Sequence, residues 1–557
     1  MIYKRKLKIL FNGEASFATT GYGAISREFL TRLNATGKYR IAELGSFAEI
    51  NDPRDHIIKW RYYANQVNDK DPRFQQFMSD ESNKTNRWRF DKVLLDFRPD
   101  IVIDIRDSTM ASWINLSPLR KYFYFIAAPS VDSAPQIDDW VSYSMQADRV
   151  VGYTDYAMDV LRQEGGGKIN LFKTAYPAVN LQTFFPIQNR AGLRQALGMH
   201  PNANIIGFCA RNQIRKLIPS LMLGFKQFLD KVKIENPSTY DSYYLYLNTT
   251  HPDLMQWDLS KLLVEYGLTN KVLFTYFCTK CGKWFPNKFQ DMITSCRFCN
   301  QNNCAILPRV NCMINESQLN EVYNLFDVYV QYVNCEGLGM PMVEAAGAGV
   351  PVMGIDYSGV GDAVRRLGGV PLRYHCLMRD IRVNADRAVP DNAHLVEELT
   401  KFFRRPREIN LRNGYKAHDI CKKKFDWDEY TNIWMEAIDT ADFTGLQGRW
   451  HHRQPYQPQQ IQDNVSISEY MNNLLDLAVQ EPHMKNTVVF DQYIKNAENG
   501  MVSTGNGVAI LSKEHIKNMI NGLVNQKMQI EQIRHGQIGL PQEDFIDYAE
   551  NKELVNL

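Results

Sequence analysis

The chain has 557 residues, of which 44% are apolar and 23% are charged. This composition excludes an intrinsically disordered chain, a collagen-like fibre and a small scaffold held together by disulfides. Lysine and arginine together number 64 against 62 aspartates and glutamates, which gives a net charge of +2. A balance so close to neutral gives no overall field that would by itself require nucleic acid or an anionic membrane as a partner.

The first residues of the chain predict a strand and not a targeting segment. They read MIYKRKLKILFN, in which basic residues precede an apolar run that is too short for a signal peptide. No apolar run elsewhere approaches the roughly 18 residues that would span a bilayer. We therefore expect a soluble cytoplasmic protein, which would work in the host cytoplasm if a virus encodes it.

The N-terminal half alternates strand patterns with helix patterns. Strands that would share one parallel sheet are predicted at 8–11, 101–105, 123–127 and 149–152. A helix is predicted at 23–33, directly after the loop TTGYG at 19–23. A strand, a glycine-containing loop and a helix start let the backbone approach a phosphate or a sugar. An ordinary tight turn is the alternative, because the glycine spacing is not that of a dinucleotide-binding loop.

A second alternating series follows residue 185. Its strands are predicted at 204–209, 243–247, 271–275, 328–332 and 351–355, and its helices at 220–229, 258–266, 316–325 and 340–348. Two such series predict an α/β protein with two facing, doubly wound, Rossmann-like domains. Ligands of these sheets bind at the carboxyl ends of the strands, so we expect the active site between the two domains.

The patterns also predict where the chain divides. The expected parts are an N-terminal domain at 1–184, a C-terminal domain at 185–428 with an insert at 277–307, a returning helix at 429–442, a linker at 443–462 and a helical extension at 463–557. The linker has no periodicity and contains several glutamines. In the extension, Ser466 and Ser512 each precede a helical pattern. This tail has an apolar face, which must pack against something.

The most informative stretch follows the predicted strand at 328–332. It reads NCEGLGMPMVEAAGAGVPV at 334–352. Gly337 and Gly339 permit close approach of a backbone, and Glu336 and Glu344 lie on either side of the predicted helix start. A helix start attracts an anion such as a diphosphate, and carboxylates accept hydrogen bonds from hydroxyl groups. The alternative is a buried strand-to-helix junction in which Glu344 only offsets the helix dipole.

A cationic segment follows the predicted strand at 204–209 in the same domain. It reads GFCARNQIRK at 207–216. Arg211 and Lys216, directly after a strand end, are suited to hold the diphosphate of a nucleotide and to neutralise the charge that grows as it leaves. Arg215 is also in this segment, and its alternative interpretation is a solvated surface charge.

Together these segments resemble the retaining glycosyltransferases of family 4, which have the GT-B fold. Glu336 and Glu344 match the E-x7-E motif of the family, and Arg211 with Lys216 match its arginine–lysine pair. The resemblance continues through YPAVNLQTFFP at 176–186, similar to the segment that joins the domains. It also includes FDWDE at 425–429, similar to the start of the returning helix, and covers roughly residues 5–440 apart from the insert.

The resemblance implies a role for each matched side chain. Arg211 and Lys216 would grip the donor diphosphate. Glu344 would hold the ribose, and Glu336 would lie beside the transferred sugar. Members of the family retain the configuration of the sugar and need no catalytic metal. The two D-x-D triplets, at 69–71 and 426–428, are therefore interpreted as unrelated to catalysis.

The resemblance also implies contacts from glycine-rich backbone on both sides of the donor. In the C-terminal domain the donor-binding residues would be Gly337, Leu338, Gly339 and Met340. In the N-terminal domain the loop with Gly21 and Gly23 would face the diphosphate.

The chain departs from the family after the predicted strand at 123–127. Many members carry a histidine there, whereas this chain reads APSVDS at 128–133. Asp132 is a candidate for that catalytic role, and Asp107, after another strand, is a second candidate. The alternative for either carboxylate is the capping of a loop.

The insert contains two C-x-x-C pairs that are separated by 14 residues. Cys278, Cys281, Cys296 and Cys299 supply four thiolates at nearly the spacing of a zinc ribbon, and tetrahedral Zn²⁺ takes such ligands. A four-thiolate site is coordinatively closed, so the predicted zinc is structural. Cys304 is a competing ligand.

Cations and aromatic residues are interleaved around these cysteines. They are Lys280, Lys283, Trp284, Phe285, Lys288, Arg297 and Phe298. This composition suits contact with nucleic acid. A solvated ribbon with a small aromatic core explains it equally well.

The sequence therefore predicts a retaining hexosyl- or pentosyltransferase that moves a sugar from a nucleotide sugar, with a UDP-sugar favoured, to a hydroxyl group. The acceptor is either a 5-hydroxymethylated base in DNA, bound through the insert, or a saccharide or small molecule. The cations of the insert favour DNA, and the near-neutral charge favours the other version. A non-catalytic sugar-nucleotide-binding module that recruits partners through its zinc ribbon is the alternative from another class. The presence of both glutamates and both cations argues against it.

Overall fold

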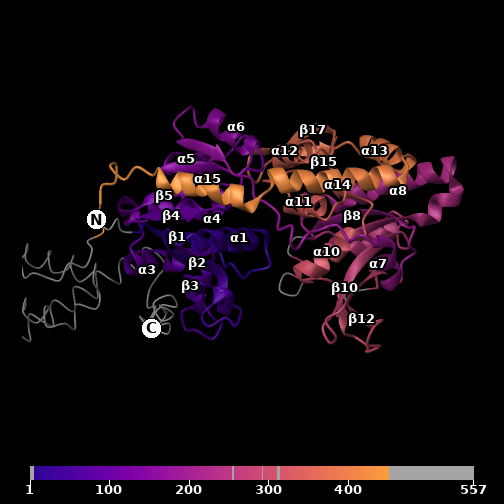
Figure 1. Ribbon diagram of the computed structural model, residues 1–557, viewed down its shortest axis with the longest axis horizontal. Helices are drawn as coiled ribbons and strands as arrows, with labels where there is room; N and C mark the ends of the chain where they lie inside the picture. The colour runs from indigo at the N-terminus through magenta and orange to yellow at the C-terminus, as the bar shows by residue number, and fades with distance from the viewer. Residues whose placement is uncertain (1–5, 254–255, 291–292, 310–313, 449, 451–557) are drawn as a thin grey trace, which may run out of the picture.

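The computed structural model describes residues 6–253, 256–290, 293–309, 314–448 and 450. Within them the chain forms an N-terminal body built on strands β1 to β7 and a C-terminal body built on strands β8 to β16 (Figure 1). Two β-sheets flanked by helices confirm the predicted α/β class. None of the helices in this part of the chain is long and apolar enough to cross a membrane. The predicted extension at 463–557 lies outside the described residues.

The N-terminal sheet is parallel throughout, with the strand order β3-β2-β1-β4-β5-β6-β7. Its strands are β1 (Lys8–Glu14), β2 (Arg40–Glu49), β3 (Arg61–Gln66), β4 (Ile101–Asp104), β5 (Tyr124–Ala127), β6 (Arg149–Gly152) and β7 (Leu171–Thr174). Its helices are α1 (Gly21–Ala35), α2 (Phe74–Met78), α3 (Trp88–Phe97), α4 (Ser108–Ala111), α5 (Asp138–Met145) and α6 (Asp155–Glu164). The central strands β1, β4 and β5 are buried on both faces, which explains why continuous apolar runs predict them.

The C-terminal sheet has the strand order β12-β13-β10-β9-β8-β14-β15-β16, and β11 also pairs with β10. Its strands are β8 (Asn204–Ala210), β9 (Tyr243–Thr249), β10 (Val272–Cys278), β11 (Trp284–Lys288), β12 (Ile293–Thr294), β13 (Ala305–Ile306), β14 (Val328–Gln331), β15 (Val352–Ile355) and β16 (Val370–Leu372). Its helices are α7 (Arg190–Ala196), α8 (Ile218–Glu235), α9 (Leu259–Glu265), α10 (Glu316–Asn324), α11 (Met340–Gly347), α12 (Ser358–Arg366), α13 (Asn392–Arg404) and α14 (Arg407–Lys424). The antiparallel strands β11, β12 and β13 belong to the insert, which therefore extends one edge of the sheet.

The chain crosses between the two bodies twice. It first crosses near 175–186 and returns between α14 and α15 (Trp427–Asp439), which lie over the C-terminal and the N-terminal body respectively (Figure 1). The amide of Val179 donates to the carbonyl oxygen of Phe425 at 3.2 Å, so the two crossings lie side by side. On the N-terminal body, Trp434 and Tyr430 pack against Phe29 of α1, with ring centroids 5.5 and 5.8 Å away.

The described part of the predicted linker also packs on the N-terminal body. The indole of Trp450 stacks on Tyr122 with ring centroids 4.7 Å apart, and its Nε1 donates to the carbonyl oxygen of Pro99 at 2.7 Å. Phe443 contacts the ring of Tyr124. The residues that follow α15 in the chain thus also cover part of the N-terminal body.

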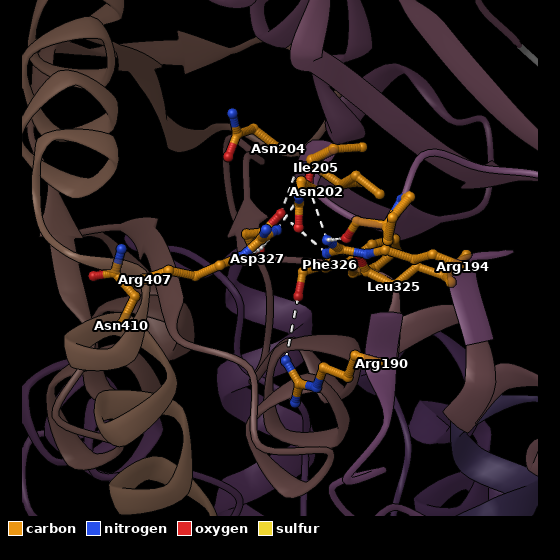
Figure 2. Close-up of polar contacts among 12 residues, drawn as sticks. Arg190, Arg194, Asn202, Asn204, Ile205, Leu325, Phe326, Asp327, Arg407 and Asn410 are labelled. Carbon is orange, nitrogen blue, oxygen red and sulfur yellow. Dashed lines mark hydrogen bonds and ion pairs between the residues drawn. The ribbon is translucent and has the colours of Figure 1, made fainter. Parts of the chain in front are cut away.

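An ion-pair network joins the C-terminal sheet to two helices. Asp327, directly before β14, accepts hydrogen bonds from Arg194 of α7 at 3.0 Å and from Arg407 of α14 at 2.7 Å, which reach it from opposite sides (Figure 2). The amide of Ile205 in β8 donates to the same carboxylate at 2.8 Å. Burial lowers the pKa of Arg194, whose side chain is only 3% exposed, although Asp327 opposes this shift. The network ties α7 and α14 to the amino ends of β8 and β14.

Candidate active site

The predicted site residues meet where the two bodies face each other. We call this region the junction. It is formed by residues that follow β1, β4 and β5 on the N-terminal side and β8 and β14 on the C-terminal side. A Cβ added to Gly337 would lie 2.0 Å from Oγ of Ser130, so the two bodies are in contact here. The carboxyl ends of parallel strands thus meet from both sides, as doubly wound sheets predict.

Glu336 lies between two cations on the C-terminal side of the junction. Its carboxylate pairs with Nζ of Lys216 and, at 2.8 Å, with Nη1 of Arg215. Lys216 is 9% exposed and Glu336 13%, whereas Arg215 is 41% exposed. Oγ of Ser358 accepts from the backbone amide of Glu336 at 3.1 Å and fixes its position. Arg215 is therefore paired with a predicted site residue, and its charge is not simply solvated.

Arg211 is held by a partner that the sequence does not reveal. Its Nη2 and Nε donate to the carboxylate of Asp253 at 2.7 and 3.1 Å. Thr250, which follows β9, donates to the same carboxylate at 2.5 Å. The side chain of Arg211 is 45% exposed. Its guanidinium group has further N–H donors besides those that bind Asp253. A carboxylate soon after a strand end is the signal that would point to Asp253.

Glu344 lies half-buried in the second turn of α11. The hydroxyl of Tyr323 in α10 donates to its Oε2 at 2.7 Å. Burial raises the pKa of Glu344 to about 7, although this hydrogen bond opposes the shift. Gly339 precedes the helix with a φ of +85°, and no side chain caps the start of α11. The first turn thus offers backbone N–H groups next to a titratable carboxyl group.

The glycine loop has one position that requires glycine. Thr20 caps α1, accepting a hydrogen bond from the amide of Gly23 at 3.0 Å. A Cβ on Gly23 would lie 2.4 Å from the carbonyl oxygen of Ala18, whereas one on Gly21 would meet nothing within 4 Å. The loop is therefore a tight capped turn, and Gly21 leaves its outer side open.

The buried carboxylate of Glu43 holds the residues that lead into the glycine loop. Glu43 of β2 accepts hydrogen bonds from the amide of Ser16 and from Nε1 of Trp60, both at 2.7 Å. Burial raises the pKa of Glu43 to about 7, against the effect of these donors. Because Ser16 begins the turn that leads to Thr20, Glu43 fixes the path of the loop.

The N-terminal side of the junction carries three carboxylates. Asp132 accepts from Arg387 of β18 at 3.1 Å and from the thiol of Cys335 at 3.2 Å, which ties it to the C-terminal side. The hairpin of β17 (Tyr374–Asp380) and β18 (Ala385–Pro390) brings Arg387 there. Asp107 precedes α4 without capping it and accepts from the hydroxyl of Tyr22 at 2.7 Å.

Glu14 is the third carboxylate and ends β1. It is 6% exposed and accepts a hydrogen bond from the hydroxyl of Thr20. Burial raises its pKa, and the positive charges of Arg106 and Arg211 oppose this shift. Desolvation by the surrounding junction likewise raises the pKa of Asp107, although the residue itself is exposed, and Asp132 and Glu14 add to the shift. Asp107 thus lies close enough to the other two carboxylates to be affected by both.

The four predicted zinc ligands come together at the outer edge of the C-terminal sheet. The Sγ atoms of Cys278, Cys281, Cys296 and Cys299 all lie within 4.8 Å of one another. Two of the separations are 3.8 Å, between Cys278 and Cys299, and 3.7 Å, between Cys281 and Cys296. Sulfurs about 2.3 Å from a tetrahedral Zn²⁺ are about 3.8 Å apart. The geometry therefore fits a zinc ion.

Each C-x-x-C pair has the backbone of a metal-binding knuckle. The amide of Cys281 points at Sγ of Cys278, and the amide of Phe298 at Sγ of Cys296, both at 3.4 Å. Gly282 closes the first turn with a φ of +69°, and its amide donates to the carbonyl oxygen of Cys278. Cys304 lies 3.6 Å from Cys278, sulfur to sulfur, and remains a neighbour of the cluster.

The aromatic residues of the insert mostly form a core. Trp284 and Phe285 are 4% and 2% exposed. Nη1 of Arg297 donates to the carbonyl oxygen of Leu197 at 2.6 Å, and Lys283 lies over the ring of Phe298. These contacts agree with a ribbon that has an aromatic core. They leave fewer groups free to bind nucleic acid.

Comparison with known proteins was made for the sequence and for the fold. No model of a protein family matches the chain. The D-inositol 3-phosphate glycosyltransferase of Streptomyces bingchenggensis is 24% identical over 222 residues. The match covers 39% of this chain and 40% of that relative, so the chain aligns with about two fifths of its length.

Solved structures match over most of the described chain. Sucrose-phosphate synthase from Thermosynechococcus elongatus superposes with a TM-score of 0.55 at 15% identity, covering 78% of this chain and 98% of the other. Anabaena HepE, solved with UDP and glucose, gives a TM-score of 0.53 at 13% identity and covers 78% and 100%. A glycosyltransferase of Rickettsia africae gives 0.53 at 12% identity and covers 78% and 98%. The chain therefore has the fold of the GT-B glycosyltransferases, two Rossmann-like bodies that face each other across the junction.

Proposed function

We propose that the protein is a retaining glycosyltransferase of the family 4 type, which moves a sugar from a nucleoside diphosphate sugar, with a UDP-sugar favoured, to a hydroxyl acceptor. The observation that carries this proposal is that Glu336 pairs with Lys216 shortly before the start of α11, with Arg211 close enough to act on the charge of Lys216. The curated relative named above is itself a glycosyltransferase. One of the solved structures with this fold contains UDP and glucose.

The C-terminal side of the junction has residues suited to bind the ribose and the diphosphate of the donor. The ribose hydroxyls would bind Glu344, and the diphosphate would bind Arg211, Lys216 and the backbone at the start of α11. Both cations are paired in the structure, Arg211 with Asp253 and Lys216 with Glu336. A bound diphosphate would share them with these carboxylates.

The proposed reaction needs charge stabilisation more than covalent help from the protein. The bond between C1 of the sugar and the phosphate oxygen breaks, and C1 bonds to the acceptor oxygen on the same face, which retains the configuration. The acceptor proton passes to the departing diphosphate. Arg211 and Lys216 stabilise the growing negative charge, while Glu336 lies on the side where positive charge develops on the sugar. No catalytic metal is proposed, because these groups neutralise the diphosphate.

For the acceptor, we favour a saccharide or another uncharged hydroxyl compound over hydroxymethylated DNA. The N-terminal side of the junction presents Glu14, Asp107 and Asp132, which would repel the phosphates of a nucleic acid. Carboxylates instead accept hydrogen bonds from sugar hydroxyls. In the C-terminal sheet, β9 and β8 lie between β10, which leads into the insert, and β14, which leads to Glu336. The cysteine cluster therefore lies away from Glu336.

The test is an assay of the full chain with a panel of nucleotide sugars. The release of UDP is measured with mono- and oligosaccharide acceptors and, in parallel, with hydroxymethylated DNA at low salt. We expect stimulation by an uncharged acceptor and a product that keeps the anomeric configuration by NMR. Stimulation by DNA alone would reverse the choice of acceptor. Binding of UDP without any turnover would make the protein a binding module instead.

Donor affinity is expected to increase as the pH rises through about 7. Burial raises the pKa of Glu344 to about 7, so the group is protonated below that pH and ionised above it. The ionised carboxylate accepts hydrogen bonds from both ribose hydroxyls, whereas the protonated form accepts fewer. The donor KM should therefore fall from about pH 6 to about pH 8. Glu344→Gln, which does not titrate, should show a higher KM and a flat profile, and an equally steep profile in this variant would refute the assignment.

We also propose that the cysteine cluster holds one structural Zn²⁺ per chain. Purified protein should contain zinc at a one-to-one ratio by elemental analysis, and Cys296→Ser should lose most of it. Cys376→Ser, at an exposed cysteine of β17 outside the cluster, is the matched control and should keep the metal. Zinc-free wild-type protein, or full zinc in Cys296→Ser, would contradict the proposal. A reducing compartment such as the cytoplasm suits these free thiols.

A further inference from the structure

Helix α10 connects the cysteine insert to the proposed ribose site. At its start, Nε2 of Gln318 donates to the carbonyl oxygen of Gly282 at 2.8 Å, within the first knuckle. One turn later, Oε2 of Glu321 accepts from Nε1 of the buried Trp284 in β11 at 2.7 Å. Two residues beyond, the hydroxyl of Tyr323 donates to Glu344 at 2.7 Å. One short helix therefore carries the contacts to both sites.

The attachment of α10 to the knuckle is also part of its own start. The Asn315 side chain accepts from the amide of Gln318 at 2.9 Å, and Oε1 of Gln318 accepts from the amide of Asn315 at 3.1 Å. This reciprocal capping box leaves Nε2 of Gln318 to reach Gly282. The position of the knuckle carbonyl therefore helps to set where the helix begins.

The same helix is fixed to the rest of the molecule. Glu316 pairs with Arg27 of α1 at 2.5 Å, across the junction. Asn320 accepts from the amide of Phe185 in the first crossing at 3.1 Å. With its first turns held by the insert and by α1, the helix has little freedom, and the hydroxyl of Tyr323 points at Glu344 in a defined place.

We propose that the insert is a positioning element for the nucleotide donor: its first knuckle and Trp284 hold α10 so that Tyr323 orients the carboxylate of Glu344 toward the ribose. This inference rests on the proposed function, because it assumes that Glu344 binds the donor. The insert would thereby contribute to binding of the nucleotide donor. A ribbon that only recruits a partner or DNA would leave donor binding unchanged.

The test separates α10 from the insert without touching the cysteines. The double variant Trp284→Phe with Gln318→Glu removes both hydrogen bonds to the insert. It keeps an acceptor for the amide of Asn315 in the capping box and an aromatic ring in the core. We expect the Kd for UDP, measured by calorimetry, and the donor KM to rise roughly three- to tenfold, as for the loss of about one hydrogen bond. The kcat should stay within about twofold, because the groups on the diphosphate are unchanged. Zinc content and the Tm report whether the insert itself has remained folded.

Three further variants distinguish positioning from general damage. Glu321→Gln keeps an acceptor for the indole N–H and should bind UDP like the wild type, whereas Glu321→Ala should weaken binding. Tyr323→Phe should weaken UDP binding by itself, and its effect should not add to that of the double variant, because both act on Glu344. Wild-type UDP affinity in a folded, zinc-containing double variant would overturn the inference. Failure of the wild-type protein to bind UDP or any other nucleoside diphosphate would instead overturn the proposed function.

Discussion

Replacing Lys216 by alanine is expected to lower the kcat of sugar transfer by about 10²-fold or more, the usual cost of removing one group that stabilises charge in the transition state. Lys216 lies against Glu336, and its side chain is only 9% exposed. Its ammonium group thus works where water screens charges poorly. The measurement is the initial rate of UDP release at saturating donor and acceptor. Arg215 would remain beside Glu336 in this variant.

A matched lysine on the next helix serves as the control. Lys226 of α8 pairs with Asp230 at the surface, where its side chain is 38% exposed. Lys226→Ala should therefore leave kcat and KM close to those of the wild type. If Lys216→Ala folds normally and turns over at the same rate as Lys226→Ala, the assignment of Lys216 to the diphosphate is wrong.

The largest effect on stability is expected at the ion-pair network of Figure 2. Asp327→Asn removes the negative charge between Arg194 and Arg407, and Arg194 is almost fully buried. Breaking a buried ion pair from one side leaves an uncompensated charge, which typically costs about 3–5 kcal/mol. The free energy of unfolding of the C-terminal body, from urea denaturation followed by tryptophan fluorescence, should fall by about this amount.

An exposed pair in the same body provides the comparison. Glu235 and Arg404 lie 3.0 Å apart, with side chains 42% and 68% exposed. Glu235→Gln should change the free energy of unfolding by less than about 1 kcal/mol, because water screens surface pairs. Equal effects of the two substitutions would mean that the network around Asp327 contributes no more than a surface ion pair.

Much of the fold can be predicted from the sequence because its central strands are apolar on both faces. The predicted strands at 8–11, 101–105 and 204–209 correspond to β1, β4 and β8. The strand β2 escapes prediction, since its buried stretch includes Glu43 and Ser46. The hydrogen-bond donors that offset the cost of burying the Glu43 carboxylate come from Ser16 and Trp60. Such compensation depends on contacts between segments and leaves no periodic signal.

The candidate site, like the fold, is predicted where short sequence motifs define it and is missed where residues far apart in the chain meet. The E-x7-E spacing and the Arg211–Lys216 pair are local, and the structure brings Glu336 and Lys216 together. Tyr323 and Asp253 lie 21 and 42 residues from the site residues that they contact. A tyrosine on an amphipathic helix looks like any core residue in the sequence. Its role becomes visible only once the fold has placed α10 beside α11.

The placement of α15 has a consequence for how the protein is made. Trp434 and Tyr430 complete the packing around Phe29, yet they follow the whole C-terminal body in the chain. At typical rates of synthesis, the N-terminal body would wait on the order of ten seconds or more on the ribosome before its cover emerges. During that time its apolar surface is open to chaperones or to neighbouring nascent chains. Fragments that end before α15 are therefore expected to be made in an aggregation-prone form.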